Sequence, residues 1–328
     1  MIMNFENFVD ELSEVLKQEF ANEQIIVQRN MVQKINGDVE QMVVKYPEQA
    51  IAPSFYLKDQ YEKLYEGYSV NEIARDMARF VRAQEKHMPE LPEFNQKTAR
   101  ENLYATVINA EINKELLKNV PHEKFQDLAV ISRFRVGKDG SIMVTNEFCK
   151  HLQLTPEEIL EIARRNMEKE KYVCISMHEK IKNEMISMGA QEDFVEELFE
   201  TRSVQFPLYV FTNSQNYDGA VAVISQSVMD EGFQKVKVDY PDISSVYVIP
   251  SSRHEIILVP DCVVDDVKHL KEIHDQVQED EVREVDRLTD QVYRYDGLSR
   301  KLSIVYADEK SKEKEQTKQQ IKTYHRAM

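Results

Sequence analysis

Residues 245–261, SVYVIPSSRHEIILVPD, are the clearest indication of the fold class of this chain. Its two apolar runs, residues 246–250 and 256–260, are rich in strand-forming residues, and each ends in a proline, which lacks the N–H that a sheet ladder needs. Residues 256–259 are apolar at every position, a pattern typical of a strand that is covered on both faces. We therefore expect a hairpin of two central strands joined by a short polar loop.

Further extended runs lie on both sides of this hairpin. Asn36 and Gly37 separate two strand-forming runs, and this pair is a strong hairpin signal because both residues tolerate the positive φ of tight turns. A second hairpin is expected between Gly137 and Gly140. The predicted strands outside the central pair are residues 25–35, 39–45, 51–57, 128–136, 141–145, 208–212, 220–224, 291–295 and 301–306.

Amphipathic periodicity predicts helices between these strands. Residues 4–20 carry one apolar stripe at helical spacing. Ser69 with Glu72, and Thr155 with Pro156, are typical helix starts, since a hydroxyl caps free backbone N–H groups and proline suits the first turn. The other predicted helices are residues 99–118, 146–152, 193–200, 226–236 and 264–279, with a short strand and then a helix over residues 172–189.

This order of elements predicts an α+β fold, in which small antiparallel sheets and meanders pack with helices in two units. Residues 1–86 are the expected N-terminal helix–meander–helix unit, and residues 98–307 the C-terminal α+β domain. Residues 87–97, HMPELPEFNQK, hold two prolines and no periodicity, so they are the expected linker. Residues 308–328 form a charged tail with few apolar side chains.

Composition and charge restrict the class of protein. With 328 residues, of which 42% are hydrophobic, the chain can bury a core. A net charge of −16 disfavours nucleic acid and anionic membranes, which attract Lys and Arg. No signal peptide and no membrane-spanning run is recognisable, so we expect a cytoplasmic protein without cofactor or structural metal. The three scattered cysteines, expected to be reduced and mostly buried, are Cys149, Cys174 and Cys262.

The polar loop formed by Ser251, Ser252, Arg253, His254 and Glu255 is the candidate binding site. Binding residues often lie on loops that a rigid scaffold holds, and we expect the last three side chains at the surface. Two other interpretations remain open. The imidazole and carboxylate are groups suited to acid–base catalysis. Alternatively the loop is structural, because adjacent residues of an extended chain point to opposite sides.

Other polar groups give weaker signals. Asp265 and His269 share a helix face, but together with Asp266 and His274 they lack the dense spacing of a metal site. Residues 213–219, NSQNYDG, are typical of a turn and lack the alternating carboxylates of a calcium loop. The chain has no P-loop, GxGxxG or GxSxG motif.

Five sequence segments occur in a particular order along the chain. They are DLAVISRFRV at residues 127–136, TPEEILEIARRNM at 155–167, YVFTNSQNYDGAVAVI at 209–224, the stretch 245–261, and LTDQVYRYDG at 288–297. Together they resemble an uncharacterised domain-of-unknown-function family of anaerobic Gram-positive bacteria over nearly the whole chain. Residues 125–307 are more distantly similar to the YtpQ-like uncharacterised proteins. Neither resemblance implies a catalytic residue, a cofactor or a substrate.

The sequence therefore favours a non-enzymatic cytoplasmic protein that acts through contacts with an unknown protein or a small ligand. No nucleic-acid or membrane partner is expected. The alternative is an enzyme of unrecognised type, hydrolase-like, with its site near residues 251–255.

Overall fold

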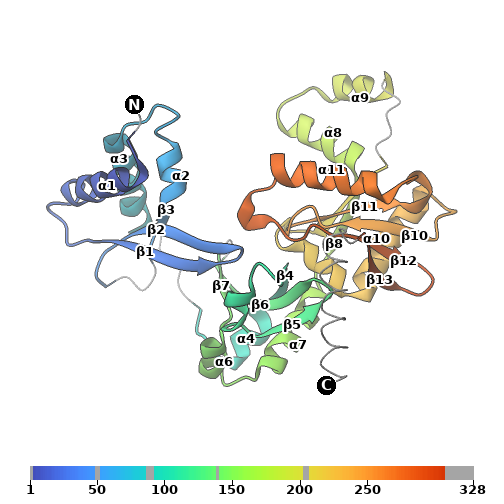
Figure 1. Ribbon diagram of the computed structural model, residues 1–328, viewed down its shortest axis with the longest axis horizontal. Coiled ribbons are helices and arrows are strands. Elements are labelled where there is room, and N and C mark those ends of the chain that lie inside the picture. The colour runs from blue at the N-terminus through green and yellow to red at the C-terminus, as the bar shows by residue number, and fades with distance from the viewer. Residues whose placement is uncertain (1–2, 49–51, 86–91, 138–139, 202–206, 307–328) are drawn as a thin grey trace, which may run out of the picture. The chain divides into compact units, whose positions relative to one another are not determined.

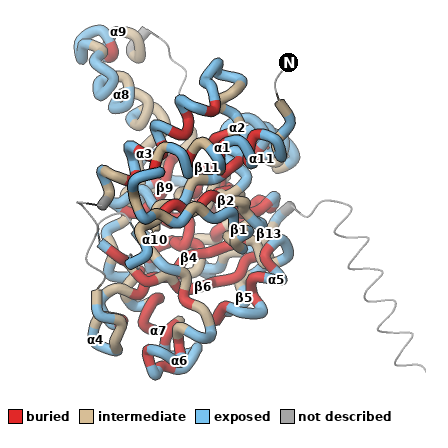
Figure 2. The backbone as a smooth tube through the Cα atoms, turned by 90° about the vertical axis from the view of Figure 1, so that its left-hand side faces the viewer, coloured by how far each residue is buried: buried red, intermediate tan, exposed pale blue. Residues whose placement is uncertain are grey.

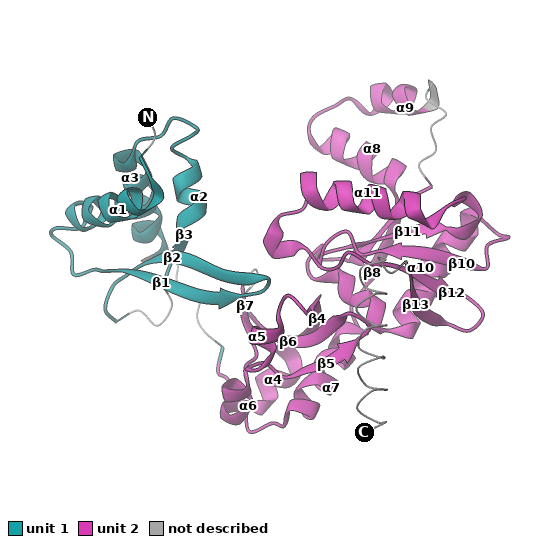
Figure 3. Ribbon diagram, in the orientation of Figure 1, with its two compact units in different colours: residues 1–92, 136–139 teal, residues 93–135, 140–328 magenta. Residues whose placement is uncertain are grey.

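The computed structural model describes residues 3–48, 52–85, 92–137, 140–201 and 207–306 (Figure 1). The charged tail predicted over residues 308–328 lies outside these ranges. Helices and antiparallel sheets make up the described residues, so the predicted α+β fold is confirmed. The chain divides into two compact units, unit 1 with residues 1–92 and 136–139, and unit 2 with residues 93–135 and 140–328 (Figure 3).

Unit 1 is a three-stranded meander with helices packed on one face. Its elements are α1 (Phe5–Glu19), β1 (Ile26–Lys34), β2 (Gly37–Lys45), β3 (Ser54–Tyr56), α2 (Leu57–Glu62) and α3 (Val70–Glu85), and the strand order is β1-β2-β3. Met42 and Val44 of β2 share one core with the apolar stripe of α1, as the periodicity predicts. Ser69 and Glu72 form the predicted cap of α3, with the Glu72 N–H donating to Ser69 Oγ at 3.3 Å. The β1–β2 turn lies at Ile35 and Asn36, one residue earlier than predicted, and Asn36 takes the positive φ.

Unit 2 contains two sheets, of which the first has the strand order β4-β6-β5 with β7 paired to β6. Its elements are α4 (Gln96–Asn102), β4 (Leu103–Asn109), α5 (Lys114–Leu117), β5 (His122–Phe125), β6 (Leu128–Val136), β7 (Gly140–Met143), α6 (Asn146–Leu152) and α7 (Pro156–Met167). Figure 2 shows buried residues concentrated along β4 and β6. Thr155 caps α7 and Pro156 lies in its first turn, as the sequence predicts, and Glu158 completes a capping box with Thr155.

The helix predicted over residues 99–118 is wrong. Helix α4 ends at Asn102, and the chain continues as strand β4, in which six consecutive residues are buried. Thr106, Val107 and Ile108 are β-branched and suit a strand with both faces covered. A short apolar run does not distinguish a buried helix from a buried strand, and this ambiguity explains the error. Strand β5 was not predicted, because His122, Glu123 and Lys124 are exposed and polar.

The second sheet of unit 2 is antiparallel with the order β13-β12-β10-β11-β9-β8. Its strands are β8 (Tyr172–Ser176), β9 (Tyr209–Asn213), β10 (Ser245–Ile249), β11 (Ile256–Pro260), β12 (Val292–Asp296) and β13 (Lys301–Tyr306). The helical segments are α8 (Met177–Ser187), α9 (Glu192–Thr201), η1 (Gly219–Ile224), α10 (Gln226–Asp239), η2 (Asp261–Val263), α11 (Val267–Asp280) and η3 (Glu284–Asp286). The predicted central hairpin is confirmed, since β10 and β11 lie in the middle of the sheet.

Helices cover both faces of the central strands. On one face, Leu270 of α11 packs with Ile249 and Ile257. On the other, α10 approaches so closely at Gly232 that a Cβ there would lie 3.1 Å from Leu258. Every residue of β11 is buried, as the apolar run predicts. The two strands are therefore a rigid support for the loop that joins them.

The strand predicted at residues 220–224 is wrong, because this segment is the 3-10 helix η1. Asp218, just before it, has a left-handed backbone with φ of 55°. The next two N–H groups, of Gly219 and Ala220, donate to the carbonyls of His254 and Arg253. These bonds turn the chain away from the sheet and against the loop between β10 and β11.

In the described residues no helix combines the length and the apolar character that crossing a bilayer requires.

Candidate functional site

The structure places the predicted loop partly inside unit 2, and the expectation of a surface position is wrong for Arg253. Its side chain is only 12% exposed and lies between two buried carboxylates. Arg253 Nε is 3.2 Å from Asp286 Oδ1 and 3.6 Å from Asp218 Oδ1. Glu255 is partly buried and accepts from Lys180 Nζ at 3.0 Å. Side chains of the loop therefore form ion pairs within unit 2, where the sequence predicts exposure to solvent.

His254 has a partner on each ring nitrogen. Its Nδ1 accepts from the backbone N–H of Asp218 at 3.2 Å, and its Nε2 donates to Asp286 Oδ1 at 3.0 Å. This pattern assigns the ring proton to Nε2 in the neutral form. The Tyr217 ring lies 4.8 Å from the imidazole, centroid to centroid. With both nitrogens occupied, the geometry favours a positioning role for His254 over proton exchange with a substrate.

The turn at residues 213–219 contacts this loop, and no feature of the sequence indicates that the two segments are neighbours. Asn213 Oδ1 accepts from the N–H groups of Gln215 and Tyr217, and its Nδ2 donates to the Tyr217 carbonyl at 2.8 Å. Asn216 and Asp218 take left-handed φ values of 53° and 55°, so the predicted turn is confirmed. We call Asp218, Arg253, His254 and Asp286 the buried ion cluster.

Asp286 is the member that is not predictable from the sequence, because it lies in the charged run EDEVREVDR and no local feature distinguishes it. Burial by itself raises the pKa of Asp286, but hydrogen bonds from His254 and Arg283 outweigh this effect and hold the pKa well below its usual range. The backbone carbonyl of Asp286 also accepts a hydrogen bond from the backbone N–H of Arg253 at 2.9 Å. The cluster thus ties the η3 segment to the loop after β10.

A dependence of stability on pH follows from the lowered pKa of Asp286. The unfolded state takes up the proton at higher pH than the folded state, so the stabilisation is present at neutral pH and is lost as the pH falls below about 5. We expect Asp286→Asn to lower the free energy of unfolding at pH 7, and the difference from wild type to shrink toward pH 3. Urea unfolding followed by circular dichroism measures this, with Asp280→Asn on the exposed side of α11 as control. A difference that stays constant across this range would contradict the assignment.

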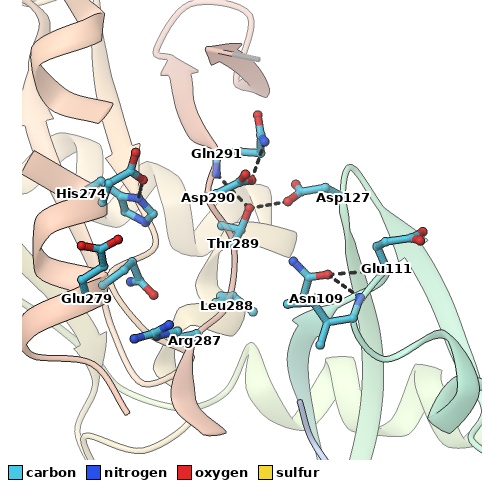
Figure 4. Close-up of a pocket in the computed structure, with 13 residues that line it drawn as sticks. Asn109, Glu111, Asp127, His274, Glu279, Arg287, Leu288, Thr289, Asp290 and Gln291 are labelled. Carbon is cyan, nitrogen blue, oxygen red and sulfur yellow. Dashed lines mark hydrogen bonds and ion pairs between the residues drawn. The ribbon is translucent and has the colours of Figure 1, made fainter. Parts of the chain in front are cut away.

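A pocket of about 590 Å³ lies elsewhere in unit 2, between the two sheets (Figure 4). Figure 4 shows His274 and Glu279 of α11 on one side, Asn109 and Asp127 on the other, and Thr289 between them. Its lining residues are Asn109, Glu111, Ile112, Asp127, His274, Asp275, Gln278, Glu279, Arg287, Leu288, Thr289, Asp290 and Gln291. They come from the end of β4, the turn before β6, helix α11 and the segment before β12.

Hydrogen bonds hold the two sides of the pocket in place. Asp127 accepts hydrogen bonds from the hydroxyls of Thr289 and Tyr293. Asn109 Oδ1 accepts from the backbone N–H groups of Glu111 and Ile112 at 3.0 and 2.9 Å, which shapes the wall on the side of Asp127. Internal hydrogen bonds of the chain therefore hold the walls of the pocket.

Two buried polar side chains of α11, those of Gln278 and His274, belong to the pocket wall. Gln278 is buried and donates to the Ser251 carbonyl, which connects the pocket to the predicted loop. His274 is 2% exposed, and its Nε2 has no hydrogen-bond partner within the described part of the chain. Nδ1 lies 3.4 Å from Asp275 Oδ1.

In the sequence, His274 stands out only as one member of a group with Asp265, Asp266 and His269 that resembles a metal site. The structure separates that group, because His269 is 75% exposed and Asp266 caps α11 by accepting from the Lys268 N–H. The pocket itself was not predicted. Its residues come from segments far apart in the chain, and no local motif marks them.

Over residues 5–297 the chain matches the model of DUF5688, a family of unknown function. The chain belongs to this family. The match covers the ion cluster and every residue that lines the pocket, and it agrees with the resemblance to a domain-of-unknown-function family. No curated protein and no solved structure matches the chain.

Potential metal ligands and thiols are the remaining reactive side chains of this family member. Across those residues, no group of three or more His, Cys, Asp or Glu side chains is arranged to hold a metal ion. Burial raises the pKa of Cys174 to about 12, and it also raises the pKa of Cys149. Cys262 is exposed, which corrects the expectation that it is buried. Its position at the start of η2, after the last residue of β11, takes it out of the sheet.

Proposed function

We propose that unit 2 is a small-ligand-binding module and that the pocket beside α11 is its binding site. One observation carries this proposal: His274, almost fully buried in the pocket wall, has no partner on Nε2 among the described residues. The volume of about 590 Å³ is in the range of small-molecule sites, roughly 300–1,000 Å³. The proposal is one of binding without catalysis.

An unpaired buried acceptor or donor is unfavourable, by about 1–3 kcal/mol, and native proteins contain few of them. A ligand that bonds to His274 Nε2 recovers this energy. Gln278 and Thr289, also buried in the lining, offer further polar atoms around it. Convergence of a few buried polar groups on one concave site is what orients a small ligand.

The preformed walls also favour binding. Thr289 and Asp127 are hydrogen bonded to each other across the two sides, and Tyr293 fixes the same carboxylate. A ligand therefore does not have to order the walls, so less of its interaction energy is lost on binding.

A thermal unfolding screen tests the proposal with the full chain. The probes are amines, amino acids, carboxylic acids, sugars, nucleosides and nucleotides, each added at several concentrations. A probe present at 100 times its Kd should raise the free energy of unfolding by about 2.7 kcal/mol. Because the chain has no tryptophan, circular dichroism is the readout.

A matched pair of variants locates the binding. Glu279 is exposed and lines the pocket, whereas Glu272 is exposed on the same helix outside the lining. Glu279→Trp should weaken the binding of each probe found by at least tenfold, because the indole fills the entrance, and Glu272→Trp should leave it unchanged. The proposal fails if no probe stabilises the protein, or if Glu279→Trp binds as well as wild type.

A further inference from the structure

Carboxylates outnumber cations around the pocket. The acidic lining residues are Glu111, Asp127, Asp275, Glu279 and Asp290, and the cationic one is Arg287. Two of the acids have a lysine partner, since Lys271 pairs with Asp275 and Lys114 lies 3.4 Å from Glu111. The excess of negative charge is therefore carried by the remaining three.

Those three carboxylates have no ion-pair partner in the described part of the chain. Asp127 accepts from two hydroxyls, which carry no charge. Asp290 accepts from the Gln291 amide at 2.6 Å, and Glu279 is exposed at the C-terminal end of α11. Negative potential in a concave site attracts cations and repels phosphates and carboxylates.

His274 offers the ligand a hydrogen-bonding atom, and the protonation of its ring decides whether that atom donates or accepts. Burial lowers the pKa of His274, against smaller opposite effects of Asp275 and the Pro250 carbonyl, so the ring is neutral at pH 7. Nδ1 lies 3.4 Å from the Asp275 carboxylate, which only accepts, and the tautomer with the ring proton on Nδ1 satisfies this contact. In that tautomer Nε2 is an acceptor without a partner among the described residues, and an N–H or O–H group of a ligand would satisfy it.

We propose that the pocket takes a small organic cation, with an ammonium or guanidinium group that donates to His274 Nε2 within the field of Asp127, Glu279 and Asp290. Ammonium and guanidinium groups are donors only, so they match an acceptor surrounded by carboxylates. This inference rests on the proposed function, and it adds the chemical class of the ligand.

Three probes of similar shape and different charge test the proposed chemical class of the ligand: benzylamine, benzyl alcohol and benzoate. Ligand-observed NMR titration of the full chain at low salt gives their relative affinities. Benzylamine should bind at least tenfold more tightly than benzyl alcohol, and benzoate should not bind. Glu279→Gln and Asp290→Asn should each weaken the binding of benzylamine about fivefold, as expected for the loss of one charge near 4 Å in water. The affinity for benzyl alcohol should not change.

Glu272→Gln is the control, since it removes one charge from α11 outside the pocket lining. If Glu272→Gln weakens the binding of benzylamine as much as Glu279→Gln does, the attraction comes from the overall negative charge and the inference is wrong. Tighter binding of benzoate, or stabilisation by MgCl₂ or CaCl₂ alone, would overturn the organic-cation class and leave ligand binding at the pocket intact. If none of the three probes and no member of the wider screen binds, the proposed function itself fails.

Discussion

Arg253→Ala should lower the free energy of unfolding by about 3–5 kcal/mol, the cost expected when one partner of a buried ion pair is removed. Arg253 Nε lies 3.2 Å from Asp286 and 3.6 Å from Asp218, and these two carboxylate side chains are 8% and 1% exposed. Without the guanidinium, both carboxylates keep the cost of burial and lose their shared cation. Urea unfolding of the full chain, followed by circular dichroism, measures the loss.

Arg283→Ala is the matched control for this change. Arg283 donates to the other oxygen of Asp286 at 2.6 Å, but its side chain is 79% exposed, so its removal should cost less than about 1 kcal/mol. Asp218→Asn in the Arg253→Ala background should recover part of the loss, because it removes a charge that no longer has a cation. An Arg253→Ala variant no less stable than Arg283→Ala would show that the ion cluster does not hold the loop.

The sequence predicts the central strands well because their signal is local. Residues 256–259 are apolar at every position, and in the structure β11 is buried along its whole length. Capping residues are equally local, and Ser69 and Thr155 cap α3 and α7 as expected. Where an element depends on contacts with distant residues, the prediction fails. Segment 220–224 has strand-like composition, but bonds to Arg253 and His254 carbonyls make it a 3-10 helix.

The candidate site is predictable only in part, for the same reason. The loop of residues 251–255 was identified from its position between two strands, but its orientation depends on Asp218 and Asp286, which lie more than thirty residues away on either side. Arginine in a polar loop is usually exposed, and only the fold reveals two buried carboxylates beside it. The pocket has no local signal, because Asp127 and Thr289 approach each other across 162 residues.

Gly219, next to the buried ion cluster, has no space for a side chain. Gly219→Ala should therefore lower the free energy of unfolding by about 3 kcal/mol or more. A Cβ at this residue would lie 2.2 Å from Thr212 Oγ1 and 2.7 Å from both the Asn213 nitrogen and the His254 oxygen. The Thr212 hydroxyl, which could rotate, is itself bonded to the His254 carbonyl at 2.7 Å. The other two atoms are backbone, so the methyl group forces η1 away from the loop.

Gly189→Ala separates this steric effect from the general cost of replacing glycine. Gly189 has a φ of 94°, but a Cβ there meets nothing within 4 Å, so only the backbone strain of about 1–2 kcal/mol is expected. Hydrogen exchange adds a local readout, because the N–H groups of Gly219 and Ala220 donate to the His254 and Arg253 carbonyls in the wild type. In Gly219→Ala, the amide of Ala220 should exchange faster than in wild type, whereas in Gly189→Ala its rate should be unchanged. Equal losses of stability in the two variants, with protection retained at Ala220, would show that η1 does not pack closely against Thr212 and His254.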